Sequence, residues 1–174
     1  MRRAVFLDRD GVVNRSLVRG GKPYAPVDPA DLEILPGVAH ALARLRDAGF
    51  VNVVVTNQPD IATGVQSLER LDEMHRRLSA SLAIDAIRVC PHVDADACGC
   101  RKPAPGLLLD AAREMGIDVS ASLLVGDRWR DIEAGQRAGC RCYFIDYNYA
   151  ETRPALPYTR VDSLAEAADL ILAR

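Results

Sequence analysis

No hydrophobic run in this sequence approaches the roughly 20 residues that a membrane-spanning helix needs, which argues against an integral membrane protein. The N-terminal segment MRRAVFLDRDG has two arginines but lacks a long apolar core and a small-residue cleavage site, so we interpret it as the start of a mature cytoplasmic protein. An excess of charge of one sign is also missing. The formal net charge is −2 with both signs interspersed, which argues against a protein that binds nucleic acid through a basic face.

Aromatic residues make up only 5% of the chain, so alanine, leucine, valine and arginine carry most of its pattern. The five cysteines are an odd number, and in a cytoplasmic protein this favours metal ligands or free thiols over a disulfide framework. No internal repeat and no long linker divides the sequence. We therefore expect one domain over residues 1–174 and, because no exposed apolar stripe is evident, a monomer.

Short apolar segments alternate with amphipathic ones along the chain. The apolar segments predict strands over residues 4–7, 51–56, 87–90, 122–127 and 140–146. Helical spacing of apolar residues, with serine, proline and glycine at the ends, predicts helices over residues 38–48, 67–82, 105–115, 129–138 and 163–172. This alternation predicts an α/β fold of the Rossmann-like kind, in which helices cover both faces of a central parallel sheet.

Polar residues follow four of these strands, in the segments DRDGVVN, TNQ, CPHVDADACGCRK and GDRWRD. Ligands of open parallel sheets bind at the carboxyl ends of the strands, so these segments are expected to meet in one site. Residues 14–36 and 57–66 form longer connections than usual. We expect them to wall the binding pocket.

Four aspartates at these strand ends suggest a divalent cation. Asp8 and Asp10 lie two residues apart in a turn that Gly11 makes possible, and such close like charges repel unless a cation lies between them. Asp127 and Asp131 add carboxylates at another strand end, and converging carboxylates are the oxygen ligands that Mg²⁺ prefers. Two alternatives remain open: a charged turn for the first pair, and a helix first-turn residue for Asp131.

Other polar residues at the strand ends suit a phosphorylated substrate. The hydroxyl of Thr56 and the backbone amides of residues 56–58 could bind phosphoryl oxygens, or could simply cap the strand. The guanidinium fork of Arg101 beside the point charge of Lys102 also suits a phosphate, although such a pair on a surface is often only solvated.

The segment from residue 90 to residue 100 brings together a set of ligands typical of structural zinc: Cys90, His92, Cys98 and Cys100. A catalytic zinc would need an open coordination position, and three cysteines cannot all pair as disulfides, while free thiols remain the simplest alternative. The spacing C-x-H-x₅-C-x-C favours one zinc ion that folds the loop and aims the two basic residues after it. Cys140 and Cys142 have no nearby histidine and are interpreted as buried small residues.

The order DxDG, TN, K and GDxxxD resembles the haloacid dehalogenase (HAD) superfamily, whose members transfer phosphoryl groups through an aspartate. The segments LDRDGVVN, TNQ and CPH…CxCRKPxPG look like the subgroup that contains the D-glycero-D-manno-heptose 1,7-bisphosphate phosphatases and the histidinol-phosphate phosphatases. The resemblance implies a HAD fold without a large cap domain, and the cofactors Mg²⁺ and Zn²⁺. It also implies hydrolysis of a small sugar phosphate, with a heptose 1,7-bisphosphate losing its 7-phosphate as the leading candidate. Histidinol phosphate is the alternative substrate, and a catalytically silent, zinc-stabilised binding module is the alternative from another class.

The resemblance also implies roles for individual residues. Asp8 would be the nucleophile and Asp10 the general acid and base. The Asp8 carboxylate, the Asp10 backbone carbonyl and Asp127 would hold Mg²⁺, with Asp131 as a further candidate ligand. Thr56 and Lys102 would stabilise the phosphoryl oxygens. The expected substrate contacts are Asn57, Gln58, Arg101, Arg19 and Arg128.

The chain departs from the subgroup after its central strand, where TNQSGIARG is common and TNQPDIATG stands here. Pro59 and Asp60 replace a small flexible pair, and Thr63 stands where an arginine is usual. Residues 15–24 lie where the family recognises the sugar, and there Arg19 and Lys22 could bind a second phosphate or form a solvated turn. These departures leave the chemistry intact and leave the sugar and its anomer open.

Overall fold

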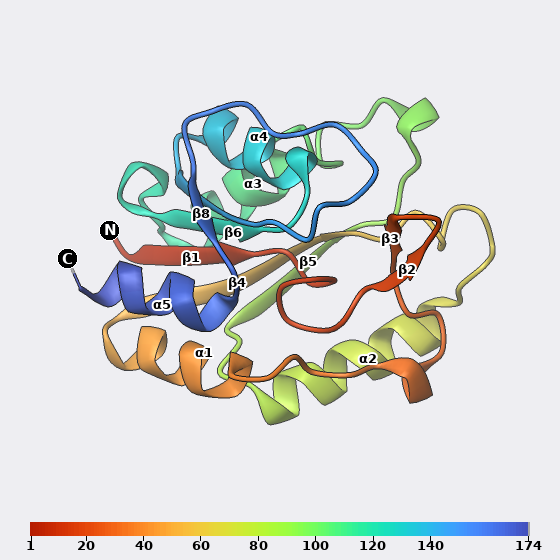
Figure 1. The fold of residues 1–174 in the computed structure, drawn as a ribbon, viewed down its shortest axis with the longest axis horizontal. Helices are drawn as coiled ribbons and strands as arrows, with labels where there is room; N and C mark the ends of the chain where they lie inside the picture. Colours follow the sequence, from red (N-terminus) through yellow and green to blue (C-terminus); the bar gives the residue numbers. More distant parts are fainter. Residues whose placement is uncertain (174) are drawn as a thin grey trace.

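A computed structural model, which describes residues 1–173, is built around a six-stranded sheet in the order β5-β4-β1-β6-β7-β8 (Figure 1). Every neighbouring pair in this sheet is parallel. The strands are β1 (Arg3–Leu7), β4 (Phe50–Asn57), β5 (Ala86–Cys90), β6 (Leu123–Gly126), β7 (Arg141–Ile145) and β8 (Thr159–Val161). Nowhere in residues 1–173 is a helix both long enough and apolar enough to cross a membrane.

Helices cover both faces of the sheet, as Figure 1 shows. On one face lie α1 (Val38–Asp47), α2 (Leu68–Ser81) and α5 (Leu164–Leu172), and on the other lie α3 (Gly106–Met115) and α4 (Trp129–Ala138). The structure confirms the predicted three-layer α/β architecture with a parallel sheet, and each predicted helix or strand ends within one residue of the observed one.

The alternation of side chains along the central strand explains why it reads as a continuous apolar run. Val5 and Leu7 of β1 pack into the core beneath α1 and α5, whereas Ala4 and Phe6 pack into the core beneath α3 and α4. All four are fully buried. A strand covered on both faces needs apolar residues at every position, unlike a strand with one face in water.

The sequence analysis missed three short strands. An antiparallel hairpin of β2 (Leu17–Arg19) and β3 (Lys22–Tyr24) lies within the segment expected to be a loop, and β8 extends the main sheet. Strands of three residues are too short to show a period in hydrophobicity. The pair Gly20–Gly21 was the one sequence signal of the hairpin, because a two-residue type I′ turn requires positive φ angles. In the structure these angles are 55° and 75°. Short 3-10 turns complete the structure at Pro29–Asp31, Asp94–Asp96 and Val119–Ala121.

The parallel pairing places the ends of the central strands side by side. Leu7, the last residue of β1, pairs with Val54 of β4 and Val125 of β6. The residues that follow these strands therefore meet at one edge of the sheet, with the β2–β3 hairpin beside them (Figure 1). Asp8 and Asp127 are brought together in this way.

Candidate active site

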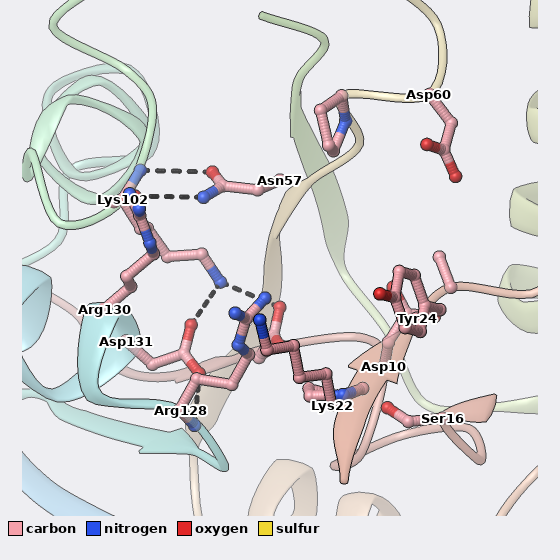
Figure 2. A pocket seen from close by; sticks show the side chains of 14 residues that line it. Asp10, Ser16, Lys22, Tyr24, Asn57, Asp60, Lys102, Arg128, Arg130 and Asp131 are labelled. Atoms are coloured by element: carbon pink, nitrogen blue, oxygen red, sulfur yellow. Dashed lines mark hydrogen bonds and ion pairs between the residues drawn. The ribbon is translucent and has the colours of Figure 1, made fainter. Parts of the chain in front are cut away.

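A cavity of about 280 Å³ lies at this edge of the sheet. Its lining comes from the turn after β1, from Ser16 and residues 22–25, from the end of β4 and the two residues Pro59 and Asp60, and from Lys102 with the start of α4 (Figure 2). Both long connections that the sequence indicated as pocket walls contribute to it.

Lys102 lies at the centre of the site, and its side chain is almost completely buried. Its Nζ donates to Asp8 Oδ1 at 2.7 Å, and it lies 2.6 Å from Asp131 Oδ1 (Figure 2). The carbonyl oxygen of Val55 in β4 accepts a third hydrogen bond, at 2.7 Å. Burial alone would lower the pKa of Lys102, but the carboxylates of Asp131 and Asp8 raise it above its usual value. The ammonium group is therefore charged and fully paired.

The carboxylates around this lysine are themselves buried. Burial and the charge of Asp131 raise the pKa of Asp8 to about 6, against the attraction of Lys102. Burial and the charge of Asp8 likewise raise the pKa of Asp127 well above its usual value. Asp127 Oδ2 accepts a hydrogen bond of 2.9 Å from Tyr149, whereas its Oδ1 is buried with no partner. This orphaned oxygen is a donor atom available to a cation.

Oxygen atoms of Asp8, Asp127 and Asp131 all lie within 4.8 Å of one another. When ionised, the three carry three negative charges, and the single positive charge of Lys102 leaves an excess of two, which matches a divalent cation. Asp131 uses both of its oxygens already, because Oδ2 accepts from the backbone amide of Arg128 at 3.0 Å. It thus caps helix α4 and binds Lys102, so Asp8 and Asp127 are the carboxylates that fit Mg²⁺ best. The side chain of Asp10 lies outside this cluster.

Asp10 reaches the cavity from the turn after β1, and both of its carboxylate oxygens accept hydrogen bonds. Gln58 Nε2 donates to Asp10 Oδ2 at 2.8 Å and also lies 2.9 Å from the hydroxyl oxygen of Thr56. Gln58 and Thr56 are buried and do not line the cavity. They lie next to Asp10, outside the cavity lining, whereas the sequence analysis predicted that Thr56 stabilises the phosphoryl oxygens and that Gln58 contacts the substrate.

Two residues with expected substrate contacts form hydrogen bonds to main-chain atoms in the structure. Asn57 lines the cavity, but its amide exchanges two hydrogen bonds with the backbone of Lys102, at 3.0 and 3.1 Å (Figure 2). Arg101 donates to Asp94 at 2.7 Å and to the carbonyl oxygen of His92 at 3.1 Å, and it is not part of the cavity lining. Its guanidinium braces the loop that carries His92.

Two arginines at the start of helix α4 line the cavity, and only Arg128 was predicted to do so from the sequence. Arg128 lines the cavity and forms an ion pair of 2.6 Å with Glu151. Arg130 also lines the cavity and donates to both oxygens of Asp94, at 3.0 and 3.1 Å. The sequence analysis missed Arg130, although GDRWRD offered the signal of a second arginine near the same strand end. Glu151 and Tyr149 follow β7 and had no local signal at all.

The remaining expected residues lie on the cavity walls or beside them. Lys22 lines the cavity, whereas Arg19 is exposed outside it, with its guanidinium 5.8 Å from the ring centre of Tyr24. Pro59 and Asp60, which distinguish this chain from the subgroup, also line the cavity. The unusual residues therefore form part of the surface that a substrate would touch.

The four proposed zinc ligands converge at a second place. Sulfur atoms of the three cysteines lie 3.1 to 3.6 Å apart, and His92 Nδ1 lies 3.5 and 3.4 Å from two of them. Three soft thiolates and one imidazole in such a cluster are the donor set of a closed tetrahedral zinc site. Cys140 and Cys142 lie apart from it, and burial raises the pKa of both thiols to about 12, as for buried small residues.

Comparisons with known proteins agree with this geometry. A family model described as haloacid dehalogenase-like hydrolase matches residues 12–139. The D-glycero-beta-D-manno-heptose-1,7-bisphosphate 7-phosphatase of Bordetella bronchiseptica is 38% identical over 146 residues, which cover 81% of this chain and 79% of that protein. The D-glycero-alpha-D-manno-heptose-1,7-bisphosphate 7-phosphatase of Mycobacterium tuberculosis is 41% identical over 139 residues, which cover 74% of this chain and 69% of that protein.

A solved structure shares the whole fold. The crystal structure of D,D-heptose 1,7-bisphosphate phosphatase from B. bronchiseptica, complexed with magnesium and phosphate, matches with a TM-score of 0.84 at 32% sequence identity. The match covers 98% of each chain. The fold is thus shared with a protein whose crystal structure contains magnesium and phosphate.

The close approach of Gly11 to Asp127 predicts a large effect of one methyl group. A Cβ at Gly11 would lie 2.0 Å from Asp127 Oδ2, while a Cβ at Gly49 would meet nothing within 4 Å, and the two φ angles are similar at +92° and +86°. Both Gly→Ala changes incur a left-handed backbone cost of about 1 kcal/mol. Gly11→Ala adds an overpacking cost of about 1–3 kcal/mol. Urea unfolding checks this, and equal losses in the two variants would contradict the close contact.

Proposed function

The chain belongs to the haloacid dehalogenase-like hydrolase family, and from this premise we propose that it removes the 7-phosphate of a D-glycero-D-manno-heptose 1,7-bisphosphate. The family and the named relatives make the protein a phosphoric monoester hydrolase. The observation that carries the proposal is the buried Lys102 ammonium group, which binds Asp8 and Asp131. It lines a cavity whose wall contains further cationic side chains. A phosphoryl group beside Asp8 would lie next to this fixed positive charge.

The reaction follows from the positions of the two aspartates. A carboxylate oxygen of Asp8 attacks phosphorus in line, the bond to the sugar oxygen breaks, and the Asp10 carboxyl group donates its proton to that oxygen. Water then attacks the phosphoaspartate while Asp10 takes up the water proton, and the bond to Asp8 breaks to release phosphate. Lys102 holds Asp8 in position and offers positive charge to the equatorial oxygens.

Asp8 and Asp127, with the backbone carbonyl of Asp10, are the residues that would hold Mg²⁺. The excess of two negative charges and the unpaired Asp127 Oδ1 support this assignment. Bound there, the ion supplies positive charge that neutralises the phosphoryl group. Asp131 serves this site indirectly, because it holds Lys102.

The substrate assignment rests on the relatives and on the charge of the cavity. Lys22 lines the cavity and forms no ion pair within residues 1–173, whereas Lys102, Arg128 and Arg130 are each paired with a carboxylate. Lys22 is therefore the lining cation free to bind a second phosphate. The two relatives are named for different anomers, so the proposal covers the heptose 1,7-bisphosphate without choosing between them.

The Cys₃His cluster is proposed to hold a structural zinc ion. Three thiolates and one imidazole leave no open coordination position, and this argues against a catalytic role. The loop also contacts the active site. Asp94, between His92 and Cys98, binds Arg101 and the cavity residue Arg130. Zinc binding would therefore fix the loop that aims these arginines.

We further propose a monomer of one domain over residues 1–174 that works in the cytoplasm. The single six-stranded sheet, with both hydrophobic cores packed against it, supports one domain. The five cysteines form no disulfide, and a thiolate metal site is favoured by a reducing compartment.

A comparison of substrates tests the assignment directly. We expect kcat/KM to be higher for one anomer of heptose 1,7-bisphosphate than for histidinol phosphate or for a panel of sugar monophosphates, because only a bisphosphate brings a second phosphate to Lys22. Phosphate release in a steady-state assay measures this. A higher kcat/KM for histidinol phosphate would overturn the substrate assignment and keep the phosphatase chemistry.

Asp8→Asn removes the nucleophile while keeping its size. We expect phosphate release to fall by a factor of at least about 10⁴, because the other groups cannot replace the attacking oxygen. Asp169→Asn, on the exposed surface of α5, is the matched control with unchanged activity. Circular dichroism and zinc content should not change in either variant, and retained turnover in Asp8→Asn would refute the role of nucleophile.

Metal analysis tests the zinc site. The purified protein is expected to contain about one zinc ion per chain, and a strong chelator should lower its thermal unfolding temperature because zinc binding contributes to folding. Cys98→Ser should reduce the zinc content, whereas Cys140→Ser, outside the cluster, should retain it. Protein purified without zinc, yet equally stable with and without chelator, would contradict the proposal.

A further inference from the structure

Arg9 lies between Asp8 and Asp10 in the sequence, in the turn after β1, and the proposed reaction leaves it without a role. It is the largest fully buried side chain in the described residues. A buried guanidinium is costly unless its N–H groups find acceptors, so its partners show what holds it there. It does not line the cavity, and a direct contact with substrate is therefore not its function.

The guanidinium of Arg9 forms hydrogen bonds with the carboxylate of Asp10. Nε and Nη2 donate to Asp10 Oδ1 at 3.1 and 2.9 Å, and Nη2 also lies 3.2 Å from Oδ2. Asn14 Nδ2 adds a third donor to Oδ1, at 2.9 Å. Three donors thus crowd Oδ1, whereas Oδ2 has one short hydrogen bond, from Gln58 at 2.8 Å.

His75 on helix α2 completes the environment of Arg9. Its Nε2 lies 3.1 Å from Arg9 Nη1. Since a guanidinium only donates, Nε2 must be the acceptor, which makes the ring neutral with its proton on Nδ1. Burial and the charge of Arg9 lower the pKa of His75 to about 4, in agreement with a neutral ring. Helix α2 thereby anchors the guanidinium from the side away from Asp10.

We propose that Arg9 is a positioning residue that immobilises Asp10 through Oδ1 and so makes Oδ2 the oxygen that exchanges the proton with substrate and water. The inference rests on the proposed function, in which Asp10 is the general acid and base. An oxygen that already accepts three hydrogen bonds has no free lone pair for a proton. The proton must reside on Oδ2, the oxygen with fewer donors.

The side-chain amide of Gln58 can form a hydrogen bond with Asp10 Oδ2 in both of its protonation states. Its Nε2 donates to the ionised Oδ2, while its Oε1 is buried without a partner. A half-turn of the amide would present Oε1 to a protonated Oδ2, and the neighbouring Thr56 hydroxyl can donate or accept in either arrangement. Gln58 Oε1, which has no partner here, would accept a hydrogen bond from Asp10 when Oδ2 is protonated.

The test separates proton transfer to the leaving group from general damage. The value of kcat/KM reports the steps up to departure of the leaving group, and a nitrophenolate leaves without help from an acid, whereas a sugar alkoxide does not. We would measure kcat/KM for heptose 1,7-bisphosphate and for 4-nitrophenyl phosphate. The variants are Arg9→Met, Arg9→Lys and Asn14→Leu, with Arg44→Met on the exposed surface as the matched control.

For Arg9→Met, we expect kcat/KM on the heptose bisphosphate to fall by about 10²-fold, the contribution typical of a positioned acid, and to fall less than about 5-fold on the aryl ester. Arg9→Lys should recover part of the loss because it restores the charge without the fork. Asn14→Leu should show the same selectivity, and it decides the question if Arg9→Met fails to fold. Arg44→Met should match the wild type on both esters.

Equal losses on both esters, or no loss, would overturn the role of Arg9 and leave the proposed function standing. A wild-type protein that hydrolyses neither ester would overturn both. Because the aryl ester needs no acid, activity on it alone also shows whether the nucleophile is competent in each variant.

Discussion

The buried ammonium group of Lys102 is the interaction on which the rest of the site depends. It joins the turn after β1 through Asp8, helix α4 through Asp131 and strand β4 through the carbonyl oxygen of Val55. Removing one partner from a buried ion pair leaves an uncompensated charge, at a typical cost of about 3–5 kcal/mol. The same contacts that hold the proposed nucleophile Asp8 therefore also hold the segment after the Cys/His loop against the sheet. In the proposed reaction, catalysis and local stability depend on one ammonium group.

Much of the site could be predicted because parallel strands end at a common edge. The apolar runs located the strands, and Asp8, Asp127 and Lys102 follow as polar residues at their ends. Arg9 and Tyr149 could not be found in this way, because what they contact depends on side-chain direction across residues far apart in sequence. The cavity lining was the least predictable part, since exposed and buried polar residues look alike in a motif.

The Cys/His loop and the cluster of Asp8, Asp127 and Asp131 form two chemically different centres, and Asp94 of the loop binds an arginine that lines the cavity. One donor set is soft and closed, and the other is hard and open to the cavity. Asp94 accepts from Arg101, which braces the loop, and from Arg130, which lines the cavity. Folding of the loop is thus linked to the charge of the cavity wall by a shared carboxylate, although neither centre contributes a ligand to the other.

The β2–β3 hairpin forms a sheet of its own and supplies Lys22 and Tyr24 to the cavity without pairing with any strand of the main sheet. Asp8 and Asp131 are held by the main sheet, by helix α4 and by Lys102, whereas the hairpin lies outside these elements. A backbone hydrogen bond of 2.8 Å from Ala150 to Gly21 ties it to the segment that carries Tyr149, the partner of Asp127. A change in the hairpin would therefore reshape one wall of the cavity while the strands that carry the aspartates keep their pairing.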